Sequence, residues 1–539
     1  MLHCTDSKRE IPVPMRLSNC AALALLLTLT TTACGDDTSQ PETEAAAAAA
    51  PAAAPPPPQP DPVSPEVLAA QELLAGLPEL GDQPFNENWT GDLDGMEERR
   101  RVRVLTVYSP GRYYIDEAQE RGLTYEMFKQ YEEYLNDHLD RKHLKVHVLF
   151  IPVARDELIP ALLEGRGDII AASLSITPER AKDIDFTKPV SKAVSEILVT
   201  GPAAPALAVI DDLSGKTVYL RASSSYRESV DELNVRLAAA GKAPVQIELV
   251  SESLEDDDLI EMVNSGMLPW AIVDNYKTAL WDGVFENITT REDIVFRSGG
   301  RIAWGLRKNS PQLMSSLNEF AATHRQGTLL GNMLVNRYIR DFDWAANALA
   351  DEDYGRLEEL AGIFRTYGEQ YGIDYLMVAA QGYQESRLRQ DARSAAGAVG
   401  VMQLLPSTAS DPNVGIHDIS EVEPNIHAGV RYLNFLRERY FSGEGISEPD
   451  HTLLALGAYN AGPARMINLR REAEQDGYDP NKWFDNVEVI AARRIGRETV
   501  QYVANIYKYY LAYRLVAQQK LDRELARAKA GITTKATSE

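Results

Sequence analysis

One glutamate, Glu385, ends an apolar run with strong helical character that begins at Tyr375. A glycine-punctuated segment follows, Gly397 to Gln403, where small residues let two stretches of backbone approach closely. A carboxyl group held between a helix end and an apolar turn loses hydration, which raises its pKa. Such a group keeps its proton near neutral pH and can deliver it to a leaving group. We therefore interpret Glu385 as a candidate general acid.

Five blocks, in a fixed order across the C-terminal part of the chain, carry a family resemblance. The blocks resemble the soluble lytic transglycosylase-like (SLT) domain of bacterial murein-cleaving enzymes, which implies an all-α, lysozyme-like fold over residues 350–520. The blocks are Glu385-Ser386, Gly397-Ala-Val-Gly-Val-Met-Gln403-Leu-Leu-Pro406, Asn425-Ile-His-Ala-Gly429-Val-Arg-Tyr-Leu433, Ala458-Tyr-Asn-Ala-Gly462-Pro463 and Glu498-Thr-Val-Gln-Tyr502-Val.

The resemblance implies an unusual cleavage of peptidoglycan glycan strands. Most glycosidases place two carboxylates around the scissile bond. The active-site positions of the family blocks hold one, Glu385, and the nearby Asp391 is expected in a surface loop. By the resemblance, Glu385 protonates the β-1,4 glycosidic oxygen between N-acetylmuramic acid and N-acetylglucosamine. It then takes a proton from the muramic C6 hydroxyl, which closes onto C1 as a 1,6-anhydro ring.

Further residues that bind the sugar follow from the same blocks. The resemblance places Ser394, Gln403, Tyr459, Asn460 and Tyr502 around the substrate. For each of these polar side chains the alternative is a structural role as a turn or helix cap.

The middle of the chain alternates short apolar strands with helical segments from Arg101 onward, which predicts an α/β domain over residues 96–345. Its block Gly165 to Pro189 resembles the family-three periplasmic solute-binding proteins, which have two α/β lobes with ligand between them. Arg180 and Asp274 come from different lobes with opposite charges, which suits a zwitterion. The alternative for Arg180 is a helix cap or a surface pair with Glu179.

A set of six side chains is implied by that resemblance to bind an amino acid, a peptide or a muropeptide. The set is Ser173, Ser175, Arg180, Ser224, Ser225 and Asp274.

The N-terminus reads as a leader over residues 1–34, followed by an Ala/Pro-rich tether over residues 35–95. Met15 is an alternative start. Cys34 follows an apolar run, as in a lipoprotein cleavage box, so we expect it to be lipidated; ordinary cleavage near Ala33 is the alternative. We expect the protein to be lipid-anchored to a membrane on the periplasmic side of the envelope. Gly35 favours the outer membrane over the inner one.

The composition of the chain argues against several kinds of binding partner. The chain has 539 residues and a formal net charge of −24, which argues against binding to nucleic acid. All three cysteines lie within the first 34 residues. We expect no metal and no cofactor, since the eight histidines form no ligand pattern. No other run is apolar enough for a transmembrane helix, and we expect a short C-terminal tail over residues 521–539.

The order of the two modules resembles the membrane-bound lytic murein transglycosylases, in which the first module is thought to regulate the second. Three hypotheses stay open at this point. The protein is a lytic transglycosylase with a sensory module, a lysozyme-like hydrolase in which water attacks, or a non-catalytic receptor for the cell wall.

Overall fold

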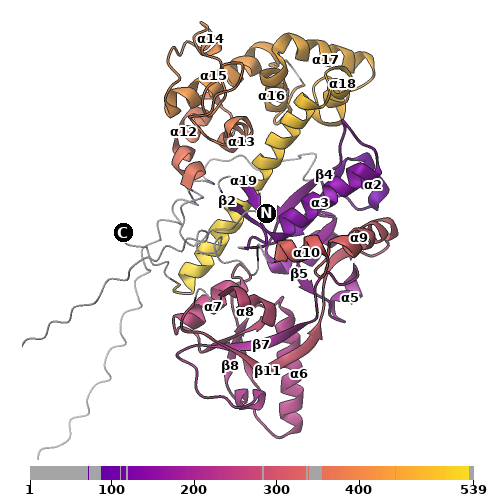
Figure 1. Ribbon diagram of the computed structural model, residues 1–539, viewed down its shortest axis with the longest axis vertical. Coiled ribbons are helices and arrows are strands. Elements are labelled where there is room, and N and C mark those ends of the chain that lie inside the picture. The colour runs from indigo at the N-terminus through magenta and orange to yellow at the C-terminus, as the bar shows by residue number, and fades with distance from the viewer. Residues whose placement is uncertain are drawn as a thin grey trace, which may run out of the picture. The chain divides into compact units, whose positions relative to one another are not determined.

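The computed structural model describes residues 71, 74, 87–109, 111–116, 119–281, 285–335, 338, 355–443 and 445–532. The chain divides into two compact units, residues 1–61 and 62–539, and all described residues belong to the second. The predicted leader, the lipidation site Cys34 and nearly all of the predicted tether lie outside the described residues. The predicted fold class, a two-lobed α/β domain followed by an all-α domain, is confirmed (Figure 1).

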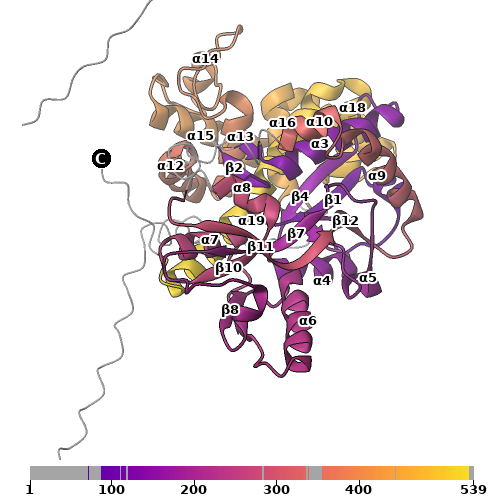
Figure 2. The ribbon, with the colours of Figure 1, turned by 60° about the horizontal axis from the view of Figure 1, so that its bottom comes forward.

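The first lobe is built on a five-stranded sheet with the order β4-β1-β5-β12-β6. Strand β1 is buried along its whole length and pairs in parallel with β4 and β5, as expected for a strand covered on both faces. Strand β12 runs antiparallel to β5 and β6. Figure 2 labels three strands of this sheet, the neighbours β4 and β1 and, beyond β5, strand β12. The strands are β1 Arg101–Thr106, β4 His147–Pro152, β5 Ile169–Ser175, β6 Ile184–Phe186 and β12 Ile302–Arg307, with a separate hairpin of β2 Tyr114–Asp116 and β3 Gln119–Arg121.

Helix α3 packs an apolar face against the sheet of this lobe. Met127, Phe128, Tyr131 and Leu135 recur at helical spacing and are buried in one core cluster with residues of the sheet such as Trp304. The helical elements of this lobe are α2 Leu93–Glu98, α3 Leu123–His138, the 3-10 turn Arg155–Glu157, α4 Leu158–Leu163, α5 Arg180–Asp183, α9 Pro311–His324 and α10 Leu329–Val335.

The described part of the domain starts inside the predicted tether. The backbone N–H of Trp89 donates to the carbonyl of Gly165 at 2.9 Å, and Arg103 donates to the carbonyl of Trp89 at 3.0 Å. The Asp92 side chain caps α2. Residues 87–95 are therefore attached to the first lobe.

The second lobe contains a three-stranded sheet, β10-β7-β11, and a parallel pair, β8-β9. The chain crosses between the lobes twice, from β6 to β7 and from β11 to β12. Sequence reasoning did not identify β7 or β11. The elements are β7 Val194–Thr200, β8 Thr217–Leu220, β9 Gln246–Leu249, β10 Trp270–Asp274, β11 Thr289–Gly300, α6 Ser225–Ala239, α7 Asp256–Asn264, α8 Asn275–Trp281 and the 3-10 turn Ile210–Leu213.

The C-terminal domain is all-helical, and its central helix is α13. All but two of the side chains of α13 are buried, and the helix packs against α12 and α19. Helix α19 continues through the first part of the predicted tail. The elements are α12 Gly355–Tyr371, α13 Tyr375–Ser386, α14 Pro406–Ala409, α15 Val422–Tyr440, α16 Asp450–Ala461, α17 Pro463–Gln475, a π-helical turn Trp483–Val487, α18 Glu488–Arg494 and α19 Arg497–Lys529. Within the described residues, no helix combines the length and the apolarity needed to cross a membrane.

Candidate active site and ligand-binding site

Helix α13 delivers Glu385 at its last turn. The carboxylate of Asp374 caps the start of the helix by accepting from the N–H of Leu376 at 3.0 Å. The helix stops because Arg387 and the next residue adopt left-handed backbone, with φ of 56° at Arg387. The hydroxyl of Ser386 donates to the carbonyl of Val401 at 2.8 Å. That bond ties the end of the helix to the glycine segment.

Glu385 lies in a partly buried position, and among the described residues one side chain donates a hydrogen bond to it. The hydroxyl of Tyr502 donates to Oε1 of Glu385 at 2.6 Å, and the amide of Gln381 donates to the Tyr502 oxygen at 3.4 Å. Burial raises the pKa of Glu385 to about 7, and the Tyr502 hydrogen bond opposes that rise. The carboxyl group therefore keeps its proton to higher pH than an ordinary glutamate, as an acid that later acts as a base requires.

The glycine segment is held by one buried amide, Asn425. Its Oδ1 accepts from the N–H of Met402 at 2.9 Å, and its Nδ2 donates to the carbonyl of Val399 at 2.8 Å. Gly400 has φ of 78°, and a Cβ there would lie 2.5 Å from Nδ2 of Asn425. Gly400 thus supplies both a left-handed turn and the room for the amide.

A cavity of about 480 Å³ opens beside Glu385. Three of the predicted site residues line it: Glu385, Asn460 and Tyr502. Sequence reasoning missed the rest of the lining, although several of these residues recur at helical spacing on α19. They are Gln384, Arg497, Glu498, Gln501 and Asn505. Glu498 adds a second carboxylate to the lining, which the sequence analysis did not place beside Glu385.

The other predicted sugar contacts make bonds within the fold. Tyr459 donates to the carbonyl of Met402 at 2.9 Å, and Gln403 donates to the carbonyl of Gly400 at 2.9 Å. Ser394 accepts from the N–H of Ala398 at 3.0 Å in an exposed turn. Ser394, Gln403 and Tyr459 do not line the cavity. Asn460 lines it while accepting from Thr499 at 2.7 Å, and Asp391 is exposed.

All six predicted ligand residues of the α/β domain meet in one small polar cavity, which has a volume of about 30 Å³. That volume holds about one water molecule. Arg180 donates to the carbonyl of Ser175 at 2.9 Å and to the carbonyl of Ser223 in the other lobe at 2.8 Å. Its guanidinium therefore bonds to backbone in this conformation, and burial lowers its pKa to about 10.

The remaining members of the set also have partners. Ser173 accepts from Arg112, Ser224 caps α6, and Ser225 donates to Glu196 at 3.0 Å. Asp274 lies 3.2 Å from Nζ of Lys277, while its other oxygen, Oδ1, is buried with no hydrogen-bond partner among the described residues. Sequence reasoning missed Lys277, whose charge lies on the same cavity. No group of three or more metal-ligating side chains occurs in the described part of the chain.

Comparison with known proteins gives two matches to family models. The model for bacterial extracellular solute-binding proteins, family 3, matches residues 101–338. The model for the transglycosylase SLT domain matches residues 362–482.

Individual proteins are also similar to this chain. The membrane-bound lytic murein transglycosylase F of Pseudomonas fluorescens (strain Pf-5) is 27% identical over 453 residues, covering 80% of this chain and 88% of the relative. The protein of the same name from Ectopseudomonas mendocina is 29% identical over 450 residues, with the same coverage. The crystal structure of the ancestral amino acid-binding protein AncCDT-1 is 20% identical, with a TM-score of 0.38 over 46% of this chain and 99% of that chain. The chain therefore joins a family 3 solute-binding domain to a transglycosylase SLT domain and is similar, over 80% of its length, to the membrane-bound lytic murein transglycosylases F.

Proposed function

We propose that this protein is a lytic murein transglycosylase that cleaves the glycan strands of peptidoglycan. The SLT domain match and the relatives named lytic murein transglycosylases support this enzyme class. The observation that carries the proposal is the state of Glu385. Burial raises the pKa of this residue to about 7, and the side chain lines a cavity of about 480 Å³.

The proposed reaction uses Glu385 twice. The protonated carboxyl group donates its proton to the glycosidic oxygen between N-acetylmuramic acid and N-acetylglucosamine, and the C1–O bond breaks. The resulting carboxylate then accepts the proton of the muramic C6 hydroxyl. At the same time the C6 oxygen forms a bond to C1. The product is a 1,6-anhydro sugar, and no water is consumed. Tyr502 holds the carboxylate in place through its hydrogen bond.

Four more residues are proposed to contribute to substrate binding. Asn460 does so from the cavity wall. Ser394, Gln403 and Tyr459 act through the turn beside Glu385, where their hydrogen bonds fix the backbone.

Digestion of purified sacculi tests this function. The wild-type protein is expected to release anhydro products, one water lighter than hydrolysed ones by mass spectrometry. Glu385→Gln is expected to lower the rate by a factor of at least about 10² while sacculus binding persists. Asp391→Asn, at an exposed carboxylate, is the matched control and is expected to keep the wild-type rate. A wild type as inert as Glu385→Gln would favour a non-catalytic receptor.

A lysozyme-like hydrolase is the second candidate, because Glu498 lines the same cavity as Glu385. In that reaction a second carboxylate directs water to C1. Hydrated products from the wild type, together with a large loss of rate in Glu498→Gln, would favour the hydrolase. Anhydro products that persist in Glu498→Gln would favour the transglycosylase.

We further propose that the α/β domain binds a cell-wall fragment, an amino acid or a peptide as a regulator. The six polar side chains on this cavity, Arg180 and Asp274 among them, support a zwitterionic ligand. Its binding requires the lobes to separate, because Arg180 bonds to the carbonyl of Ser223 in the other lobe. Calorimetric titration of muropeptides into the full chain tests this. Saturable heat in the wild type that is lost in Arg180→Gln is expected, and no heat with any fragment would count against it.

Membrane anchoring through a lipid on Cys34, on the outer membrane, is proposed from the leader sequence. Metabolic labelling with palmitate tests it. The label is expected in the wild type and absent in Cys34→Ser.

A further inference from the structure

The α/β domain contains a second cavity that is much larger than the polar one around Arg180. Its volume is about 300 Å³, which lies within the usual range of small-molecule sites. It is lined by α3, α10, the connection from β6 to β7, the starts of β12 and α8, and residues of β5. Of the six predicted ligand residues, only Ser173 lines both cavities.

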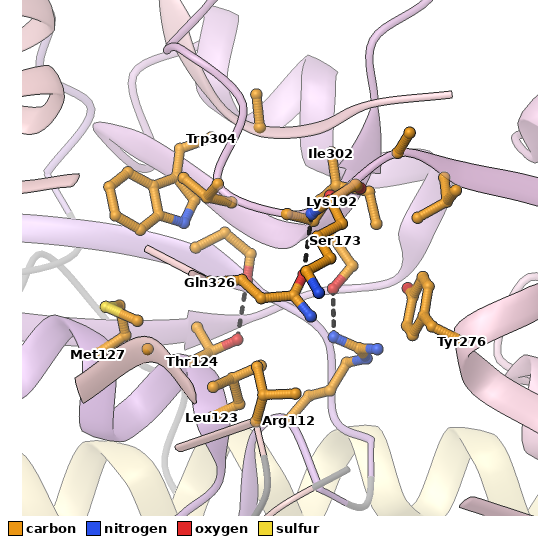
Figure 3. A pocket seen from close by; sticks show the side chains of 18 of the residues that line it. Arg112, Leu123, Thr124, Met127, Ser173, Lys192, Tyr276, Ile302, Trp304 and Gln326 are labelled. Carbon is orange, nitrogen blue, oxygen red and sulfur yellow. Dashed lines mark hydrogen bonds between the residues drawn. The ribbon is translucent and has the colours of Figure 1, made fainter. Parts of the chain in front are cut away.

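One end of this cavity is apolar. Figure 3 places Met127 and Trp304 together at that end, and Leu123 lies below them. Phe128, which is fully buried, belongs to the same wall. These side chains offer an apolar surface whose removal from water would favour the binding of a hydrocarbon or aromatic group.

The opposite end is polar and cationic. In Figure 3, Arg112, Ser173 and Tyr276 lie together there, and Arg112 donates to the hydroxyl of Ser173. The guanidinium of Arg112 lies 5.2 Å from the centroid of the Tyr276 ring. The hydroxyl of Tyr276 is buried and has no hydrogen-bond partner among the described residues. A buried hydroxyl without a partner costs free energy that a ligand oxygen would recover.

The described residues place only positive charges on the lining. Arg112 forms no ion pair with a carboxylate among the described residues, and Lys192 contributes a second, exposed cation from the connection between β6 and β7. No aspartate or glutamate of the described part of the chain lines the cavity. The cavity therefore attracts an anion and disfavours a cation.

Ser173 adds an observation on the backbone. Its φ is 56°, in the left-handed region that serine seldom adopts. Such residues cost free energy and cluster at ligand sites. Here the strained residue holds Arg112 at the mouth of the polar end.

From these observations we infer that this cavity binds a monocarboxylate with an apolar or aromatic body. The carboxylate lies between the guanidinium of Arg112 and the hydroxyl of Tyr276, and the apolar body lies against Met127 and Trp304. A single arginine with one of its nitrogens already bonded to serine matches a single carboxylate. The site is independent of the proposed catalytic function, since all its residues lie within residues 112–335.

The test is calorimetric titration of 3-phenylpropionate into the full chain. Saturable binding is expected, with the neutral analogue 3-phenylpropan-1-ol about tenfold weaker because it lacks the charge. Arg112→Gln is expected to weaken the acid at least about tenfold, and Tyr276→Phe a few-fold. Acetate, which lacks the apolar body, is expected to give no saturable heat.

Arg236→Gln is the matched control, because Arg236 is an exposed arginine of the same domain that does not line the cavity. It is expected to bind the acid like the wild type, and thermal melts of all variants check that each is folded. Equal affinity for acid and alcohol would overturn the inference. So would unchanged binding by folded Arg112→Gln, or the absence of saturable heat in the wild type.

Discussion

Glu385 shows how an ordinary residue acquires a special pKa from its neighbours. Burial at the end of α13 raises its pKa to about 7. Only the Tyr502 hydroxyl partly offsets that effect by donating to the charged form. The balance between these two contributions sets the fraction of Glu385 that carries a proton at the working pH.

The first prediction follows from that balance and concerns Tyr502→Phe. Removing a hydrogen bond that stabilises the carboxylate raises the pKa of Glu385 further. Glu385 then stays protonated to higher pH, so the alkaline limb of the kcat/KM profile is expected to move to higher pH. A pH-rate profile on solubilised peptidoglycan measures this. An alkaline limb that stays in place would show that Glu385 does not set it.

The second prediction concerns stability. The pKa of Glu385 is about 7 in the folded protein, above the ordinary value of 4.5. Between pH 4.5 and 7 the folded protein therefore binds more protons than the unfolded one. Stability is therefore expected to fall as pH rises from 4.5 to 7, by at most about 3 kcal/mol. Glu385→Gln removes this cost and is expected to raise the Tm at pH 8 but not at pH 4.

Asp391→Asn provides the control for that measurement, because Asp391 is exposed. Its Tm is expected to follow that of the wild type at both pH values. A Glu385→Gln variant with the same Tm as the wild type at pH 8 would contradict the burial argument.

At the scale of elements, the turn after α13 depends more strongly on Gly400 than on Gly397. A side chain at Gly400 would collide with Asn425, whereas Gly397 has open space around it although its φ is also positive, at 88°. Gly397→Ala is expected to cost about 1 kcal/mol of backbone strain. Gly400→Ala adds a steric clash, typically about 1–3 kcal/mol more.

Urea unfolding of both variants measures this third prediction. Gly400→Ala is also expected to reduce activity, because the displaced turn carries Val401, which anchors the end of α13 through Ser386. Equal losses in the two variants would show that the Asn425 contact relaxes without cost.

On the scale of the whole molecule, the fold depends on packing and buried polar contacts rather than on covalent cross-links. The three cysteines all lie in the first 34 residues, so the protein from residue 35 onward has no thiol. The fourth prediction is that a reducing agent leaves the Tm and the activity of a protein made from residue 35 onward unchanged. Thermal melts with and without dithiothreitol check this, and a lower Tm with reductant would contradict it.

Sequence reasoning succeeded where the signal is local. The helix that carries Glu385 was predicted from an apolar run, and the strands predicted from Arg101 onward begin with β1, Arg101–Thr106. Strand β11 was missed because its sequence, TTREDIVFRSGG, is rich in charge and glycine and its pairing is interrupted by register shifts. Tertiary pairing, not local preference, makes that segment a strand.

The candidate functional sites show the same division between local sequence signals and tertiary structure. Block order in the sequence by itself determined the two modules. It also predicted Glu385 as the acid and six polar ligand residues, Arg180 among them, that line one cavity in the structure. Only the tertiary structure decided that Arg180 bonds to backbone carbonyls, that Glu498 shares the cavity of Glu385, and that Arg112 lies beside Tyr276 at one end of a second, half-apolar cavity. The physical reason is that a residue's identity is local, whereas its burial, its partners and the space beside it depend on segments far apart in the chain.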